Sequence, residues 1–248
     1  MRIAVQLYTL RELLTADTWG TLHRLAEMGF ESGQLAGTYG HSAQEFAERC
    51  REIGFRGIAP HMGMEEFEQR PEDVAGLCRA LGTDTAVLPW IGREVYGDGW
   101  AQAAVRLDAI GRTMKGLGLR FLYHNHAFEF EQEGGRPGFD VLWESSDPSL
   151  VGCEMDAYWV KFGGGDPVDY LKLLKGRVKT MHFKDMKAGE KMEMEDVGSG
   201  TLDWDGIIPA AKEAGVEYAI IEHDSPPGDP LEHVARSRDY LIGRGLSD

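Results

Sequence analysis

The feature that most constrains the fold is an alternation of eight short apolar runs with amphipathic segments along all 248 residues. The runs are Ile3–Tyr8, Ser32–Ala36, Gly57–His61, Thr85–Trp90, Leu119–His126, Leu150–Asp156, Val178–Phe183 and Tyr218–Glu222. Most of them are almost continuously apolar, which is typical of strands that are buried on both faces of a parallel sheet. We therefore predict eight parallel β-strands.

The segments between the runs have the apolar period of amphipathic helices. The first four are punctuated at their ends by glycines, and the later ones begin near proline or tryptophan: Gly29, Gly54, Gly82 and Gly118, then Pro137, Pro167, Trp204 and Pro230. Glycine just past a helix and proline near its start are common helix boundaries. The pattern thus predicts one helix after each strand.

Eight strand–helix pairs without a linker predict a (β/α)8 TIM barrel of the α/β class, with residues 1–248 as a single domain. The alternative is a doubly wound open sheet, which usually carries a glycine-rich phosphate-binding turn after its first strand. That turn reads Thr9-Leu10-Arg11-Glu12 here, so the sequence favours the barrel.

Four polar clusters stand at the carboxyl ends of predicted strands, where TIM barrels carry their chemistry. They are Tyr123-His124-Asn125-His126, Glu154-Met155-Asp156, His182-Phe183-Lys184-Asp185 and Glu222-His223-Asp224. Parallel neighbouring strands would bring these clusters together, and His, Asp and Glu in one dry pocket can bind a divalent metal ion. We predict Asp156, His182 and Glu222 as ligands of such an ion.

Three basic residues of these clusters are candidates for catalysis. His124 and His126 are two residues apart and share one face of the fifth strand, so either or both can point into the barrel mouth. Lys184 shares the face of His182, where its ammonium group could neutralise a developing oxyanion. The alternative for Lys184 is a solvated surface charge.

Four further residues are candidates for substrate binding. His61 ends the third strand and either contacts substrate or packs in the core. Glu129 follows the fifth strand and could act as a ligand or as an acid or base. Trp90 and Trp159 could form aromatic walls of a sugar site, although aromatic residues in such positions are as often part of the core.

The acidic composition limits the partners. At a net charge of −15, nucleic acid is repelled at long range, and the chain has no basic run to overcome this. No apolar run approaches the ~18 residues of a membrane span. Because the chain enters a predicted strand at Ile3, we expect no signal peptide. The widely spaced Cys50, Cys78 and Cys153 predict reduced packing residues. We expect a cytoplasmic protein, and a homo-oligomer is compatible with the sequence.

These segments together resemble the sugar phosphate isomerase/epimerase family of xylose isomerase-like barrels. The resemblance rests on Ala4-Val5-Gln6-Leu7-Tyr8, YHNHAFEF at 123–130, the Asp156 strand with Gly165-Asp166-Pro167, His182-Phe183-Lys184-Asp185, the Gly198–Trp204 loop and Glu222. It implies a divalent cation, most often Mn²⁺ but also Mg²⁺, Co²⁺ or Zn²⁺, held by Glu, Asp, His and Glu of the last four strands. Three ligands carry over as Asp156, His182 and Glu222, and the fourth position falls on or near His124.

Two departures from the family pattern stand out. The position of the family's fifth-strand glutamate falls on or near His124, with Glu129 as the other candidate, and Gln34 stands where many relatives have glutamate. A similar histidine-rich fifth strand occurs in relatives that resemble inosose dehydratase, which eliminate water from a keto-inositol. The fifth-strand acid or base would then be His124, His126 or Glu129.

The resemblance implies proton transfer next to the carbonyl of a sugar or cyclitol, through a metal-stabilised enediolate. We expect an isomerase or epimerase of carbohydrate metabolism, with Glu222 as ligand and proton carrier and a fifth-strand histidine as its counterpart. A dehydratase, that is a carbon–oxygen lyase, is the main alternative. An endonuclease IV-like nuclease and a non-catalytic sugar-binding barrel are less favoured. No Arg/Lys clamp for phosphate is evident, which favours an unphosphorylated substrate.

Overall fold

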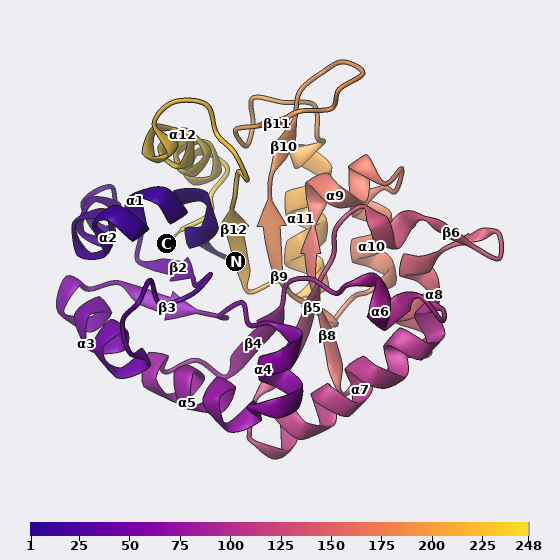
Figure 1. Ribbon diagram of the computed structural model, residues 1–248. Helices are drawn as coiled ribbons and strands as arrows, with labels where there is room; N and C mark the ends of the chain where they lie inside the picture. The colour runs from indigo at the N-terminus through magenta and orange to yellow at the C-terminus, as the bar shows by residue number, and fades with distance from the viewer. Residues whose placement is uncertain (248) are drawn as a thin grey trace.

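Eight parallel strands ringed by helices form the core of the computed structural model, which describes residues 1–247 (Figure 1). The strands follow the order β3-β2-β1-β12-β9-β8-β5-β4 around the sheet. Their bounds are β1 Arg2–Gln6, β2 Ser32–Gln34, β3 Arg56–Ile58, β4 Thr85–Leu88, β5 Arg120–His124, β8 Val151–Asp156, β9 Val178–Phe183 and β12 Tyr218–Ile221. The predicted (β/α)8 barrel is confirmed.

The two edge strands of this sheet, β3 and β4, meet through a short seam that nearly closes the barrel. A parallel bridge joins His61 to Val87. The Val87 N–H donates to the carbonyl of Pro60 at 3.0 Å, and the Met62 N–H donates to the carbonyl of Val87 at 3.0 Å. The seam holds His61 at the same end of the barrel as the carboxyl ends of the other strands.

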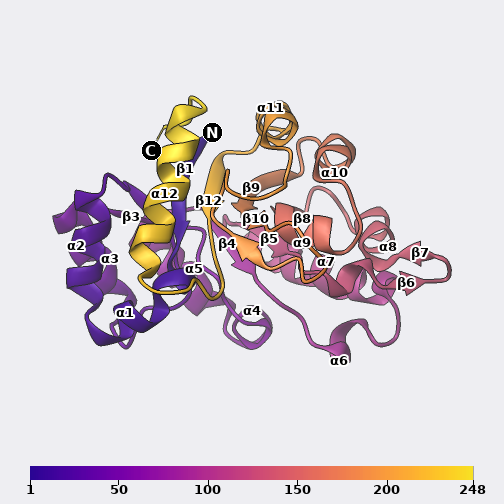
Figure 2. The same ribbon diagram turned by 90° about the horizontal axis from the view of Figure 1, so that it is seen from above.

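Helices cover the outside of the strands, and α12 packs beside β1, near both chain ends (Figure 2). Their bounds are α1 Arg11–Ala16, α2 Thr18–Glu27, α3 Ala43–Ile53, α4 Met64–Gln69, α5 Pro71–Leu81, α6 Arg93–Tyr96, α7 Trp100–Gly116, α8 Gly138–Ser145, α9 Ala157–Phe162, α10 Pro167–Leu173, α11 Trp204–Ala214 and α12 Pro230–Gly243. The predicted glycine boundaries are confirmed at Gly54 and Gly82, which end α3 and α5 in the left-handed conformation that glycine adopts readily.

Apolar side chains fill the space between strands and helices, and a smaller apolar group fills the lower barrel interior. That inner group comprises Ala4, Ile58, Ala59, Val87, Leu122 and Ile220. Burying one large aliphatic side chain contributes roughly 1.5–3 kcal/mol. The apolar floor therefore supports a polar layer that lies above it at the carboxyl ends of the strands.

Several elements differ from the sequence prediction. The first strand stops at Gln6, because the Gln6 side chain accepts a hydrogen bond from the Tyr8 N–H and the chain turns into a 3₁₀ helix, Leu7–Leu10. Two small antiparallel ribbons were not predicted; they are β6 Gln132–Glu133 with β7 Arg136–Pro137, and β10 Asp185–Met186 with β11 Met194–Glu195.

The expectations for cysteine are confirmed within the described chain. Cys50 in α3, Cys78 in α5 and Cys153 in β8 are free and buried. Burial raises the pKa of the Cys50 and Cys78 thiols to about 12. Among residues 1–247, no helix combines the length and apolarity needed to cross a membrane.

Candidate active site and metal centre

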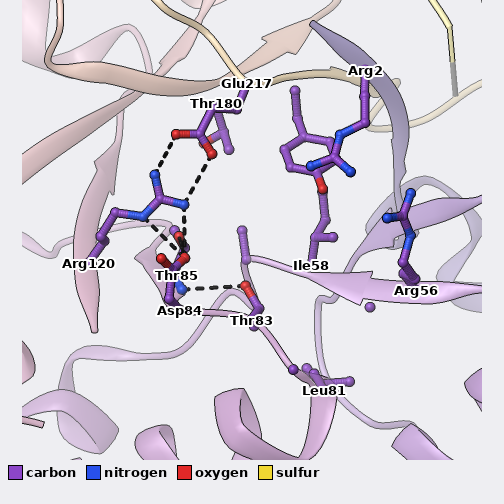
Figure 3. A pocket seen from close by; sticks show the side chains of 14 residues that line it. Arg2, Arg56, Ile58, Leu81, Thr83, Asp84, Thr85, Arg120, Thr180 and Glu217 are labelled. Atoms are coloured by element: carbon purple, nitrogen blue, oxygen red, sulfur yellow. Dashed lines mark hydrogen bonds and ion pairs between the residues drawn. The ribbon is translucent and has the colours of Figure 1, made fainter. Parts of the chain in front are cut away.

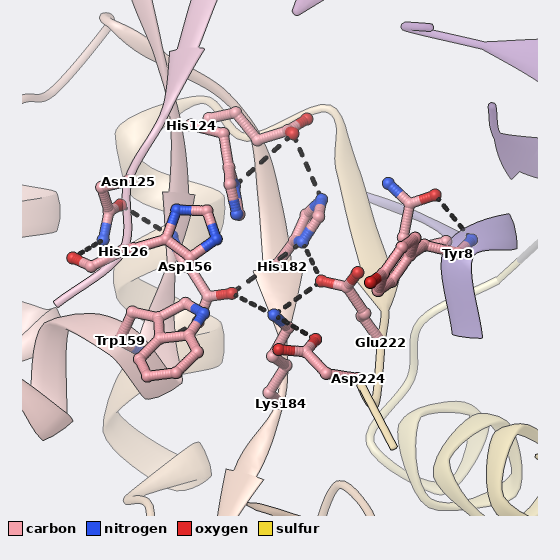
Figure 4. Close-up of polar contacts among 12 residues, drawn as sticks. Tyr8, His124, Asn125, His126, Asp156, Trp159, His182, Lys184, Glu222 and Asp224 are labelled. Atoms are coloured by element: carbon pink, nitrogen blue, oxygen red, sulfur yellow. Dashed lines mark hydrogen bonds and ion pairs between the residues drawn. The ribbon is translucent and has the colours of Figure 1, made fainter. Parts of the chain in front are cut away.

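The three residues predicted as metal ligands lie together at the mouth of the barrel (Figure 4). Asp156 ends β8, His182 lies in β9 and Glu222 follows β12. The His182 Nδ1 atom is 2.6 Å from Glu222 Oε2 and 3.9 Å from Asp156 Oδ2. Both Asp156 and His182 are fully buried. The parallel strand order thus brings together side chains that are far apart in sequence.

His124 stands beside this group at the end of β5. Its ring centre is 4.3 Å from that of His182, and its Nδ1 has no hydrogen-bond partner among residues 1–247. His124, Asp156 and His182 can each place a ligand atom within 4.8 Å of the other two. A second group with the same property is His61, Glu154 and His182, so His182 belongs to both.

Lys184 places its ammonium group among three carboxylates. The Nζ atom is 3.0 Å from Asp156 Oδ2, 2.7 Å from Glu222 Oε2 and 2.9 Å from Asp224 Oδ1. The side chain is buried, so the alternative of a solvated surface charge is wrong. Burial alone would lower the pKa of Lys184, but Asp156 and Glu222 raise it well above its usual value.

The neighbouring groups have pKa values that follow from the same balance of burial and charge. Burial opposes the charge of His182, but Glu222 and Glu154 raise its pKa to about 10. Burial raises the pKa of Asp156 to about 6, against the lowering effect of Lys184. The pKa of Glu222 is lowered, because Lys184 and His182 outweigh the cost of burial. Lys184, His182 and Glu222 are therefore all charged at neutral pH.

A cavity of about 460 Å³ opens above these groups. It is lined by Tyr8, Ala36, His61, Pro89, Trp90, His124, His126, Lys184, Glu222, Asp224 and Ser225. Tyr8 and Trp90 are 43% and 57% exposed, respectively, and form its aromatic rim. The cavity is large enough for a small polyhydroxy molecule, and its floor carries the charged groups.

Residues 22–242 match the Xylose isomerase-like TIM barrel family. The chain belongs to this family.

Two curated relatives of this chain are both described as inosose dehydratase. Inosose dehydratase of Lacticaseibacillus casei is 28% identical over 163 residues, which cover 58% of this chain and 54% of the relative. Inosose dehydratase of Clostridium perfringens (strain 13 / Type A) is 26% identical over 264 residues, which cover 89% of this chain and 87% of the relative. The first of these matches spans about half the length of the relative.

Solved structures of three proteins share the barrel. A sugar phosphate isomerase/epimerase from Parabacteroides distasonis has a TM-score of 0.83 at 22% identity, with 97% of each chain covered. The probable 3-DHS dehydratase AsbF from Bacillus anthracis has a TM-score of 0.77 at 15% identity, with 98% of this chain and 100% of that chain covered. The IOLI protein, described with a binding zinc atom, has a TM-score of 0.69 at 14% identity and covers 98% of this chain and 97% of its own. At these identities the likeness shows the fold.

The possible ligand atoms at this site fit a divalent metal ion. His124 Nδ1 is buried and makes no hydrogen bond within residues 1–247, and Asp156 Oδ2 contacts Lys184 without the geometry of one. Imidazole nitrogen together with carboxylate oxygen is a donor set that Zn²⁺, Mn²⁺ and Co²⁺ accept. Buried nitrogen and oxygen atoms that face one another with their lone pairs are costly unless a cation or a proton lies between them.

The predicted substrate-binding residues divide into two groups. His61 and Trp90 line the cavity. Glu129 does not: it is fully buried, and its carboxylate accepts hydrogen bonds from the Tyr123 hydroxyl at 2.6 Å and the His126 N–H at 2.9 Å. Glu129 therefore holds the segment after β5 in place and does not reach into the cavity. This corrects the expectation that it contacts substrate.

Trp159 and His126 lie side by side at one flank of the site (Figure 4). Trp159 is not among the residues that line the cavity, although its ring is 5.6 Å from the ammonium group of Lys184. His126 does line the cavity, and its Nδ1 is buried without a hydrogen-bond partner in the described chain. Burial, followed by the charge of Lys184, lowers the pKa of His126 to about 3.

Sequence reasoning noted Gln34 and Glu154 but did not predict that they belong to a buried polar layer below the predicted ligands. This layer consists of Gln6, Gln34, Glu154 and Thr180, all buried and joined by hydrogen bonds. The signal that could have found them is a polar residue on the inward face of a buried strand. Glu154, for example, is two residues before Asp156 and so shares its face of β8.

A separate cavity of about 450 Å³ lies at the opposite end of the barrel (Figure 3). Arg2, Arg56 and Arg120 line it, but Arg120 already donates to Glu217 at 2.6 Å and to Asp84 at 2.8 Å. TIM-barrel chemistry takes place at the carboxyl ends of the strands, so we place the active site at the mouth that holds His182.

Proposed function

We propose that the protein transfers a proton next to the carbonyl group of a sugar or cyclitol, and that it acts as an isomerase or epimerase. The observation that supports this best is the placement of two proton-carrying groups around a fixed positive charge. His126 and Glu222 line the same cavity, on opposite sides of the Lys184 ammonium group (Figure 4). Such a pair can act on both faces of one carbon atom.

Asp156, His182 and Glu222, with His124 beside them, would hold the divalent ion. When bound, the ion would supply Lewis-acid stabilisation of the negative charge that develops on the carbonyl oxygen. We propose Mn²⁺ as this ion.

The side chains divide the remaining work. Glu222 accepts the proton from the carbon beside the carbonyl. His126, which is neutral because burial lowers its pKa, takes up a proton from solvent and delivers it from the other side. Lys184 donates a hydrogen bond to the oxygen that gains negative charge. A positioned acid or base contributes roughly 10²–10⁴-fold to the rate, and a preorganised donor at the oxygen adds to it.

A dehydratase is the second candidate, because the curated relatives described above carry the name inosose dehydratase. The first step is the same removal of a proton beside the carbonyl. The hydroxyl group on the next carbon then leaves as water, with a proton from the charged Lys184 or from His126 after His126 has taken up a proton from solvent. Both outcomes need the same cavity and the same groups, so the products decide between them.

The test is solvent exchange. Protein loaded with Mn²⁺, Co²⁺ or Zn²⁺ is incubated in D₂O with ketoses and with keto-inositols, and deuterium uptake and water loss are measured by NMR. We expect uptake of deuterium beside the carbonyl, and a loss of roughly 10²–10⁴-fold in Glu222→Gln. The control is Glu213→Gln, an exposed residue of α11 that is paired with Lys175. Wild-type exchange in Glu222→Gln would remove the assigned role of Glu222.

A further inference from the structure

We propose that Glu154 and Gln34 are positioning residues for the metal centre, which fix the proton of His182 on Nε2 and leave Nδ1 to bind the ion. This rests on the metal centre of the proposed function, but not on the substrate. The inference follows from a chain of hydrogen bonds whose directions are set at both ends by the backbone.

The first end of the chain is the amide group of Gln6. Its Oε1 accepts a hydrogen bond from the Tyr8 N–H at 3.1 Å, so its Nε2 is the end that faces the barrel interior. That Nε2 donates to Gln34 Oε1 at 2.8 Å. It also lies 3.4 Å from His61 Nδ1, which can only accept from an amide N–H. The proton of a neutral His61 is therefore on Nε2.

The second end of the chain is the carbonyl group of Ala59. Gln34 Nε2 donates to this carbonyl at 2.9 Å and to Glu154 Oε2 at 2.7 Å. Ala59 has φ = 37°, a left-handed conformation that is costly for a residue with a Cβ atom. These two contacts use both amide hydrogens of Gln34 and fix the orientation of its amide group. The atom that faces His182 is therefore Oε1, a hydrogen-bond acceptor.

The orientation of Gln34 determines which nitrogen of His182 carries a proton. His182 Nε2 is 2.6 Å from Gln34 Oε1, so Nε2 must be the donor. The other nitrogen, Nδ1, is 2.6 Å from Glu222 Oε2. An unprotonated nitrogen and a carboxylate oxygen repel each other at this distance, so a second proton or a metal ion must lie between them.

Glu154 supplies the negative charge of this arrangement. Its carboxylate is fully buried, accepts from the Thr180 hydroxyl at 2.6 Å and lies 2.7 Å from His61 Nε2. It is also 3.2 Å from His182 Nε2, on the side opposite to Glu222. The outer N–H of His182 is donated to Gln34, and the Glu154 carboxylate beside it acts through its charge. Partners of this kind orient a metal-binding histidine and make its inner nitrogen more basic. Losing such a partner typically lowers metal affinity 10–100-fold.

The contact between Gln34 and Glu154 allows a test in which amide and carboxylate exchange places. The variants are Glu154→Gln, Gln34→Glu and the double swap, and Glu213→Gln is the exposed control. Each metal-free protein is titrated with Co²⁺ or Mn²⁺ in a calorimeter, and its thermal unfolding is recorded. We expect affinity losses of roughly 10–100-fold in both single variants. In Gln34→Glu the cause is repulsion between two carboxylates at the 2.7 Å contact.

The double swap should recover most of the lost metal affinity, because one carboxylate and one amide again face His182. Metal affinity that stays at the wild-type value in Glu154→Gln, even if the unfolding temperature falls, overturns the inference. If Glu154→Gln does not fold, Thr180→Val removes one hydrogen bond to the same carboxylate and should give a smaller loss of affinity; no loss would also overturn it.

A spectroscopic measurement reads the proton of His182 directly. In Zn²⁺-loaded protein, two-bond ¹H–¹⁵N spectra should place the proton on Nε2, and a proton on Nδ1 would overturn the inference. The outcome is separable from that of the proposed function. A wild-type protein that binds metal through this arrangement but exchanges no proton with any ketone refutes the function and leaves the inference standing.

Discussion

The ammonium group of Lys184 lies 2.7 Å from the carboxylate of Glu222, and the Lys184 side chain is only 2% exposed. Asp156 and Asp224 complete a ring of three carboxylates around it. Two of these carboxylates, Asp156 and Glu222, are also proposed ligands of the divalent ion. Lys184 and the ion therefore neutralise the same carboxylates. When one of the two cations is absent, the other should stabilise the folded protein more.

Replacing Lys184 by Met tests this coupling. Without the ammonium group, buried carboxylates lose their counter-charge, and breaking a buried ion pair typically costs about 3–5 kcal/mol. We expect the free energy of unfolding of the metal-free variant to fall by about this amount in urea titrations. An added divalent ion should stabilise Lys184→Met more than the wild type, because the ion replaces the missing charge.

The matched control for this variant is Lys187→Met. Lys187 is 43% exposed and its nearest carboxylates are 3.8 Å away, so its removal should cost less than about 1 kcal/mol. Equal losses in the two variants would show that the buried position of Lys184 carries no special weight.

Asp185 organises the segment that follows the small ribbon β10–β11. Its carboxylate accepts from four donors of residues 198–204, namely the N–H groups of Gly198, Gly200 and Leu202 and the indole of Trp204. In Asp185→Asn an NH₂ group would face one set of these donors. Because each buried unsatisfied donor costs about 1–3 kcal/mol, we expect a loss of at least about 2 kcal/mol and faster proteolysis of this segment.

Asp203→Asn is the control in the same segment. Asp203 caps α11 by accepting from the Gly206 N–H at 3.1 Å, and asparagine caps helices about as well as aspartate. The free energy of unfolding of Asp203→Asn, and the rate at which its 198–204 segment is cleaved by protease, should stay close to the wild-type values. A similar effect in both variants would mean that the segment responds to any loss of charge.

The fold could be predicted because its signals are local. Each strand of the barrel is a short apolar run, and β9 spans Val178–Phe183 as expected. The small ribbons could not be predicted in this way, because Asp185–Met186 and Met194–Glu195 are two-residue strands without a periodic pattern. Their pairing depends on the course of the chain around the barrel.

The proximity of Asp156, His182 and Glu222 could also be expected, because the carboxyl ends of parallel strands meet at one rim. Their roles remain predictions. The surroundings of Lys184 could not be foreseen, because its partners come from β8 and from the segment after β12, and only distances across the barrel decide whether they meet. The buried amides of Gln6 and Gln34 likewise gain their meaning only from contacts between strands.

Glu129 should make the stability of the protein depend on pH. Burial raises its pKa to about 7 in the folded protein, from about 4.5 in an exposed glutamate. A raised pKa means that the folded state binds the proton more tightly, so this stabilisation is complete below about pH 4.5 and is lost as the pH rises through about 7. The shift corresponds to about 3 kcal/mol.

Glu129→Gln removes the titrating group and keeps its shape, and the Tyr123 hydroxyl can rotate to accept from the new amide. The free energy of unfolding of this variant should fall less than that of the wild type between about pH 4.5 and pH 8. Glu131→Gln, at an exposed position two residues away, should leave the wild-type pH dependence unchanged. Identical pH profiles for Glu129→Gln and wild type would contradict the assignment.

Binding of the divalent ion should stabilise the folded protein through Asp156. A ligand that binds only the folded state adds about 2.7 kcal/mol of stability at one hundred times its dissociation constant. We expect this gain in the wild type, measured as the rise in unfolding free energy when Mn²⁺ or Zn²⁺ is added to chelator-treated protein. Asp156→Asn should lose most of the gain, because it removes a proposed ligand next to His182.

Asp224→Asn is the matched comparison: Asp224 also contacts Lys184 but is not a proposed ligand, so this variant should keep the gain. If both variants lose it equally, the ion is held by the charge of the ring as a whole, and the assignment of Asp156 as a ligand fails.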